Sequence, residues 1–88
     1  MRAWRLEYGL ELLQKINDDP GRVPSHYIKQ FEYQRRAFLR YNDLWYDGLI
    51  EVHEEEGYGR KTLTVTDKGR RILELAEQME EVYTEGRT

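Results

Sequence analysis

A few residues in the sequence are of types that catalyse reactions or bind metals, but their spacing argues against both. Ser25 is the only serine, and His26 beside it diverges from it on a helix, so the two cannot act as nucleophile and base. His53 and Glu54 follow one another in an expected strand, where successive side chains point to opposite faces and cannot share an ion. We therefore expect no enzyme, no cofactor and no metal site, and no small-molecule effector is evident.

A basic segment in the middle of the chain offers a different chemistry. Between Arg22 and Tyr41 lie five Lys and Arg residues and one acid, Glu32, although the net charge of the chain is −3. The flanking regions are acidic, with four glutamates from Glu51 to Glu56 and five from Glu74 to Glu85. This bipolar pattern indicates either a surface for an anionic partner or two solvated faces that differ in sign.

The length and composition of the sequence limit the class of protein. With 88 residues we expect a single domain over 1–88, with a core so small that dimerisation would help it. The sequence has no cysteine, which fits a reducing cytoplasm, and no apolar run long enough to span a membrane.

The first helix is predicted over residues 3–18, and the breakers at 18–21 end it. Apolar residues form two stripes along it: Leu6, Leu10, Leu13 and Ile16 in one, and Trp4, Tyr8 and Leu12 in the other. Two stripes fit either contact with both the core and a partner subunit, or burial of one wide face.

Two further helices are expected around the basic segment. After a short extended piece at 22–24, Ser25 is predicted to be the N-cap of a helix over 26–32. A longer helix is predicted from Gln34 to Asp47, ended by Gly48. Its core face is predicted to hold Ala37, Phe38, Tyr41, Leu44 and Trp45, and the face left for a partner holds Arg35, Arg36, Leu39, Asp43 and Tyr46.

A hairpin and a last helix complete the chain. Strands are predicted over 49–53 and 61–65, with Leu63 and Val65 facing inward and the turn between them at 54–60. Thr66 is expected to cap the last helix, and Gly69 to let it pass close to another backbone. Residues 84–88 are expected to form a frayed tail.

The complete order is helix, short strand, helix, helix, β-hairpin and C-terminal helix, an α+β, mainly α arrangement. The run Leu44-Trp45-Tyr46-Asp47-Gly48-Leu49-Ile50 resembles the end of the recognition helix in winged helix-turn-helix regulators. The run from Leu63 to Leu73 resembles the entry to the last helix of MarR-type and PadR-type repressors. Size and acidic ends also resemble small winged-helix proteins of archaea and their viruses.

The resemblance implies that the helix over 34–47 enters the major groove of double-stranded DNA and that the hairpin is a wing. Carried over by position, the residues near base edges would be Gln34, Arg35, Arg36 and Leu39, and those near phosphates Ser25, Lys29, Tyr33 and Arg40. Arginine can bridge two acceptors of guanine, and glutamine can pair with adenine. The wing departs from the pattern, because glutamates occupy 54–56 and only Arg60 and Lys61 could meet phosphate.

Two functions remain open at this point. The first is a cytoplasmic, homodimeric transcriptional regulator that binds a specific DNA sequence. Its expected dimer interface consists of Trp4, Tyr8, Leu12, Leu75, Met79 and Val82. The second is a winged-helix module that binds a basic protein through its acidic wing and tail, without DNA binding.

Overall fold

The computed structural model describes residues 7–57 and 59–85. In this part of the chain three helices precede an antiparallel hairpin and a long last helix, as predicted. The elements are α1 (Gly9–Asp18), α2 (Pro24–Ile28), α3 (Gln34–Tyr46), β1 (Ile50–Glu54), β2 (Lys61–Val65) and α4 (Asp67–Glu85). None of the helices within these ranges is long and apolar enough to cross a membrane.

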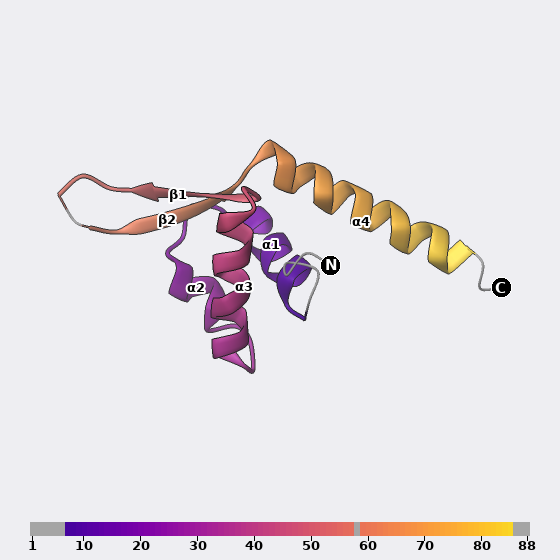
Figure 1. Cartoon of the computed structure of the whole chain (residues 1–88), viewed down its shortest axis with the longest axis horizontal. Helices are drawn as coiled ribbons and strands as arrows, with labels where there is room; N and C mark the ends of the chain where they lie inside the picture. Colours follow the sequence, from indigo (N-terminus) through magenta and orange to yellow (C-terminus); the bar gives the residue numbers. More distant parts are fainter. Residues whose placement is uncertain (1–6, 58, 86–88) are drawn as a thin grey trace.

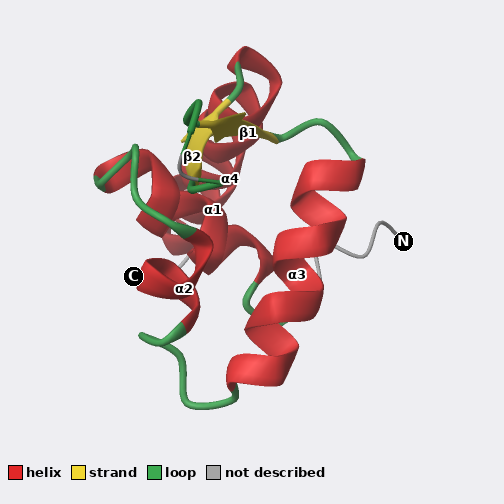
Figure 2. Cartoon of the chain, turned by 90° about the vertical axis from the view of Figure 1, so that its left-hand side faces the viewer, coloured by secondary structure: helices red, strands yellow, loops and turns green. Residues whose placement is uncertain are grey.

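The hairpin lies across one side of the helical body. Both views show α2 and α3 on the same side of the hairpin, with α3 ending next to β1 (Figures 1 and 2). The register pairs Ile50 with Val65 and Val52 with Leu63, which places the apolar members of both strands on one face. That face packs on the helices, so Leu63 and Val65 are buried as their alternation predicts, and Ile50 is buried with them.

The predicted short strand at 22–24 does not form as a strand of the described sheet, which is two-stranded. The segment nevertheless runs alongside β2 and is tied to it by backbone hydrogen bonds. The amide of Gly21 donates to the carbonyl of Leu63 over 2.8 Å, and the amide of Leu63 donates to the carbonyl of Arg22 over 3.0 Å. These two bonds hold the connection from α1 to α2 against the sheet.

The core lies where α1, α2, α3 and the hairpin meet. Its buried residues come from every one of these elements and from the turns beside them: Leu12, Leu13, Ile16, Tyr27, Phe31, Ala37, Leu44, Leu49, Ile50, Leu63 and Val65. Leu12 is only 1% exposed, because both of its helical neighbours in the core, Leu13 and Ile16, lie on the same wide face of α1. The expectation that Leu12 forms part of a dimer interface is therefore wrong.

Two helix starts differ from the prediction. Helix α1 begins at Gly9 because Tyr8 adopts a left-handed conformation with φ of 75°, while residues 3–6 lie outside the described part. Helix α2 begins at Pro24, whose fixed φ suits the first helical turn, so Ser25 lies inside the helix and its side chain caps nothing. The N-cap prediction for Ser25 is wrong because Pro24 takes the first helical position and Val23 precedes the helix.

Helix α2 also ends earlier than predicted, at Ile28. The following turn is tightened by hydrogen bonds from the amide of Gln30 to Tyr27 and from the amide of Phe31 to Ile28, each 3.1 Å long. Phe31 therefore points into the core from the turn, where its side chain is buried.

Helix α4 leaves the body at a tightly packed joint. The Thr66 hydroxyl accepts from the Gly69 amide at 3.1 Å, which confirms the predicted cap, and donates to the Gly48 carbonyl at 2.7 Å. A Cβ on Gly69 would lie 2.2 Å from the Leu49 carbonyl oxygen, which confirms the predicted close approach. Beyond this joint α4 projects away from the body and continues through Thr84 to Glu85, two residues expected in the tail (Figure 1); residues 86–88 lie outside the described part.

Candidate nucleic-acid interface

Helix α3 is the element that would present the basic residues, and its two ends are well defined. It begins after Tyr33, whose carbonyl accepts from the Ala37 amide at 3.1 Å. At the other end Gly48 has φ of 74°, and the amides of Gly48 and Leu49 return to the carbonyls of Trp45 and Leu44. This left-handed glycine closes the helix as predicted and turns the chain into β1.

The core-facing side of α3 is narrower than the sequence suggested. Ala37 and Leu44 are fully buried and Tyr41 is half-buried, but Phe38 is 49% exposed and Trp45 is 57% exposed. Each of these two residues follows a buried one and therefore lies about 100° further around the helix, at the rim of the buried face. Their assignment to the core is wrong, and both rings remain on the surface of the described chain.

The opposite side of α3 is open, as predicted for a face that meets a partner. Arg35, Leu39 and Tyr46 are exposed, and Gln34 lies at the start of the same helix. Within residues 7–57 and 59–85 the structure shows no ion pair or side-chain hydrogen bond for Arg35 or Gln34. These two side chains can therefore reach a ligand without breaking an internal contact to another described residue.

The two other arginines of α3 are engaged inside the molecule. The Arg40 Nε atom lies 3.2 Å from Asp43 Oδ2, and the Arg40 side chain is only 14% exposed. Contact between Arg40 and a DNA phosphate would have to break this largely covered ion pair. Arg36 is more open, but its Nη1 lies 3.0 Å from Glu7 Oε2 and its guanidinium carbon lies 4.9 Å from the centre of the Tyr33 ring.

Ser25 in α2 and Lys29 directly after α2 are two of the residues expected near phosphates. Lys29 and Ser25 are exposed, and the Ser25 carbonyl accepts from the Lys29 amide, so both lie on one short helical turn. Their side chains make no hydrogen bond or ion pair with another described residue. Both side chains are thus open to solvent, and their contact with DNA phosphates stays a prediction.

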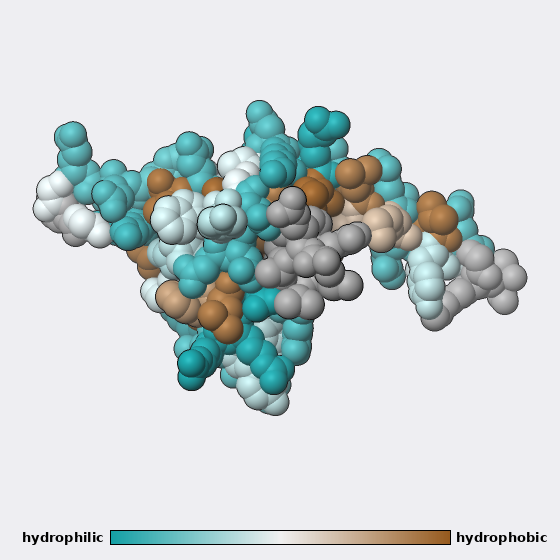
Figure 3. Space-filling view, in the orientation of Figure 1, coloured by the Kyte–Doolittle hydropathy of each residue, from teal (hydrophilic) through white to brown (hydrophobic). Residues whose placement is uncertain are grey.

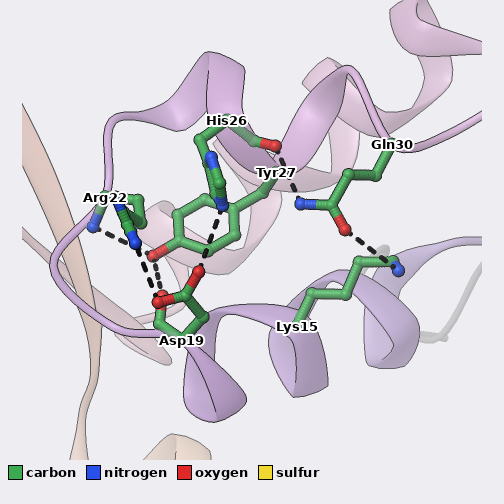
Figure 4. A network of polar contacts seen from close by, with 6 residues as sticks. All are labelled: Lys15, Asp19, Arg22, His26, Tyr27 and Gln30. Atoms are coloured by element: carbon green, nitrogen blue, oxygen red, sulfur yellow. Dashed lines mark hydrogen bonds and ion pairs between the residues drawn. The ribbon is translucent and has the colours of Figure 1, made fainter.

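A polar network ties α2 and the segment before it to the end of α1 (Figure 4). Asp19 is its centre: its carboxylate lies 3.1 Å from His26 Nε2 and 3.4 Å from Arg22 Nε. The Tyr27 hydroxyl donates to the Asp19 carbonyl at 2.5 Å and accepts from the Arg22 amide at 3.1 Å. Figure 4 shows these groups converging between α1 and α2, with Lys15 and Gln30 joined at a second point.

Burial changes the acidity of tyrosines in this frame. Loss of solvent raises the pKa of the Tyr27 hydroxyl above its ordinary value of 10.0, and the negative charge of Asp19 raises it further, while the hydrogen bond from the Arg22 amide lowers it. Burial likewise raises the pKa of Tyr41. Both hydroxyls therefore stay protonated at neutral pH, and Tyr27 keeps the donor that its contact with Asp19 needs.

The wing carries few cations that DNA could reach. Its turn is closed by a 2.9 Å hydrogen bond from the Glu55 amide to the Arg60 carbonyl, and Arg60 itself is exposed. Lys61 Nζ lies 3.9 Å from Glu54 Oε1, so part of its charge is compensated within the wing. Along the described wing residues, acids outnumber bases, and α3 rather than the wing is the basic surface.

Apart from the buried Leu12, the expected dimer residues divide into three groups. Trp4 lies outside the described residues, and Tyr8 packs its ring 4.7 Å from that of Phe31, partly inside the body. Leu75, Met79, Val82 and the neighbouring Tyr83 are all between 56% and 68% exposed along one face of α4. Figure 3 shows hydrophobic side chains along the projecting helix, where they border a shallow groove with Leu10 and Ile72.

Sequence reasoning missed the internal partners of the arginines. Asp43 lies three residues after Arg40, a helical spacing at which opposite charges meet, so this pair was visible in the sequence. Glu7 lies 29 positions from Arg36 in the chain, and no local pattern could have indicated their contact.

Comparison with known proteins identifies the fold but not a family by sequence. No family model matches the chain, and no curated protein is detectably similar to it. FabT of Streptococcus pneumoniae, solved in complex with DNA, superposes with a TM-score of 0.68 at 24% identity over 88% of this chain and 55% of its own. MarR superposes at 0.65 with 21% identity over 93% and 64%, and the transcriptional regulator SlyA at 0.69 with 16% identity over 90% and 60%.

The chain therefore spans between about half and two thirds of the length of these solved structures. At such low identity the likeness concerns architecture, and the three superpositions agree with one another. They confirm the prediction that the chain has the winged-helix fold of MarR-family regulators.

Proposed function

We propose that this chain is a sequence-specific, double-stranded DNA-binding protein that acts as a homodimeric transcriptional regulator, with α3 in the major groove. The observation that supports it most is the open side of α3, where Arg35 and Gln34 have no partner among the described residues. This surface occurs on a winged-helix frame that superposes on a structure solved with DNA. Lys29 and Ser25 beside it supply donors suited to phosphate oxygens.

Arg35 is the residue we assign to base recognition. Its guanidinium is exposed near the start of α3, the part of a recognition helix that contacts base edges. Arginine binds guanine through two parallel hydrogen bonds, which lysine cannot reproduce with the same geometry. Leu39 and Tyr46 lie on the same open side and would contact the groove through apolar atoms.

Selection of bound sequences from random duplexes tests the function and supplies the site. Arg35→Ala should then weaken binding to the selected site by about 1–3 kcal/mol and relax the preference at one base position. Arg71→Ala, which removes the same charge from the exposed side of α4, is the matched control and should leave the preference unchanged. Failure of the wild-type chain to bind any duplex at low salt would refute the DNA-binding role and favour the alternative, a module for a basic protein.

The apolar face of α4 is our candidate for the dimer contact. Leu75, Met79 and Val82 project into solvent with more than half of each side chain exposed, an unusual cluster for an isolated chain. A second copy that covers this face would gain roughly 25 cal/mol for each Å² of apolar surface removed from water. The same arrangement would place two α3 helices on successive turns of a near-palindromic site.

Sedimentation of paired variants tests the dimer. Met79→Glu introduces a charge at the centre of the apolar face and should convert the dimer to monomer at micromolar concentration. Thr84→Glu adds the same charge on the polar side of α4, where Thr84 is exposed, and should leave association unchanged. Unchanged association of Met79→Glu would show that the two chains meet elsewhere.

A further inference from the structure

Arg36 is held in the folded chain by two groups that contact its guanidinium. Its Nη1 atom is 3.0 Å from Glu7 Oε2, and its guanidinium carbon is 4.9 Å from the centre of the Tyr33 ring. Glu7 precedes α1, and Tyr33 precedes α3, so the contact joins two separate elements. The Arg36 and Glu7 side chains are 59% and 58% exposed, which leaves the pair in contact with water and open to competition.

Arg35 offers a direct comparison one residue earlier. It has the same charge and an exposed position, but no ion pair or hydrogen bond to another residue in the described ranges. The two arginines lie about 100° apart around the helix, so only Arg36 faces the segment that contains Glu7. In the free protein one arginine is thus available to an anion and its neighbour is already bound to one.

We propose that Glu7 competes with DNA for Arg36, so that binding must exchange the Glu7 carboxylate for a DNA phosphate. This proposal places Arg36 at the DNA backbone and not near the base edges, where the resemblance put it. This inference rests on the proposed function of α3. A carboxylate and a phosphate present similar anionic oxygens to a guanidinium, so Glu7 occupies the donors that a phosphate would use. The Tyr33 ring keeps the guanidinium on this side of α3 in either state, because stacking on an aromatic face does not consume its N–H donors.

This competition lowers affinity for every duplex and contributes nothing to the choice of sequence. The effect must be small, because exposed ion pairs are weak and are screened by salt. It is also reversible, since the pair involves no buried charge and no rearrangement of the core. Glu7 therefore sets how tightly the protein binds DNA in general, whereas Arg35 sets which sequence it prefers.

Affinity measurements on Glu7→Gln test the proposal. The variant keeps the shape of the side chain but removes the negative charge, and should bind the selected duplex about 2- to 5-fold more tightly at low salt. The gain should be similar for an unrelated duplex and should shrink as salt is added. Glu11→Gln removes the same charge from an exposed position on α1 and reports the change expected from net charge alone.

A double-mutant cycle with Arg36→Gln separates the specific contact from a general field. If Glu7 acts through Arg36, then in the Arg36→Gln background the substitution Glu7→Gln raises the affinity for DNA no more than Glu11→Gln does. The proposal is overturned if Glu7→Gln raises the affinity for DNA fully in the Arg36→Gln background. It is also overturned if Glu7→Gln leaves the affinity of the otherwise wild-type chain unchanged or lowers it. If the folded wild-type chain binds no DNA at all, the proposed function fails and this inference with it; wild-type binding with no effect of Glu7→Gln overturns this inference alone.

Discussion

The joint between the hairpin and α4 allows a quantitative test with a single methyl group. In Gly69→Ala the new Cβ would lie 2.2 Å from the Leu49 carbonyl oxygen and 2.7 Å from Val65 Cγ1. Ordinary contact requires roughly 3.4 Å, so two backbone segments would have to separate by about 1 Å, a displacement that cores resist at a cost of about 1–3 kcal/mol. The Leu49 oxygen also accepts from the Thr66 amide at 3.1 Å, and loss of that bond adds roughly 1 kcal/mol.

Helix propensity opposes this cost. Alanine is favoured over glycine inside a helix by about 1 kcal/mol, so the expected net loss is about 2 kcal/mol. A chain of 88 residues has a total stability of roughly 4–13 kcal/mol, which makes such a loss easily measurable.

Urea unfolding followed by circular dichroism, at one fixed protein concentration, measures the loss. Arg71→Ala, two residues further along α4 and exposed, is the control and should change the free energy of unfolding by less than about 0.5 kcal/mol. Equal or greater stability of Gly69→Ala would refute the reasoning, because it would show that the helix and the Leu49 carbonyl do not approach as closely as the structure indicates.

Three further substitutions address the frame around α3. Tyr27→Phe removes the hydroxyl between the Asp19 carbonyl and the Arg22 amide and should cost about 1–3 kcal/mol in urea unfolding. Burial raises the pKa of the Tyr27 hydroxyl above 10.0 in the folded state. The stability that this hydroxyl contributes is therefore present below pH 10 and is lost as the pH rises through the raised pKa. In alkaline buffer the urea midpoint of the wild type should thus fall faster than that of Tyr27→Phe. Thr66→Ala removes the cap and should lower the thermal midpoint by an amount equivalent to about 0.5–2 kcal/mol. Leu12→Ala should cost about 2–5 kcal/mol whatever the protein concentration, whereas a residue at a dimer contact would show a concentration-dependent loss.

The order of the elements followed from local signals in the sequence. Gly48 indicated the end of α3, and the structure gives it the left-handed conformation that such an end requires. The alternation around Leu63 predicted which side of β2 is buried, and Thr66 followed by a helical pattern predicted the cap. These signals act over a few residues, so a single sequence was enough to find them.

Features that depend on contacts between distant residues could not be predicted from the sequence. Phe38 and Trp45 share one side of an ideal helix with Ala37 and Leu44, but the position of α3 against α1 and α2 buries Ala37 and Leu44 and leaves the other two exposed. The pairing of Arg36 with Glu7 joins residues that lie 29 positions apart in the sequence. Hydrophobic periodicity describes one helix at a time. It cannot predict which part of the apolar side is covered when the helix packs against its neighbours.

The joint at the base of α4 also has a geometric consequence. Thr66 and Gly69 fix the direction of α4 against the carbonyls of Gly48 and Leu49, in the turn between α3 and β1. If two copies meet through their α4 helices, the fixed angle between α4 and the body sets the distance between their two α3 helices. Helix α4 then acts as a lever of fixed length. A small change of angle at Gly69 would then move the far ends of the lever by several times as much as the joint itself. The spacing between the two halves of the DNA site would thus be determined by one backbone contact that lies remote from any base.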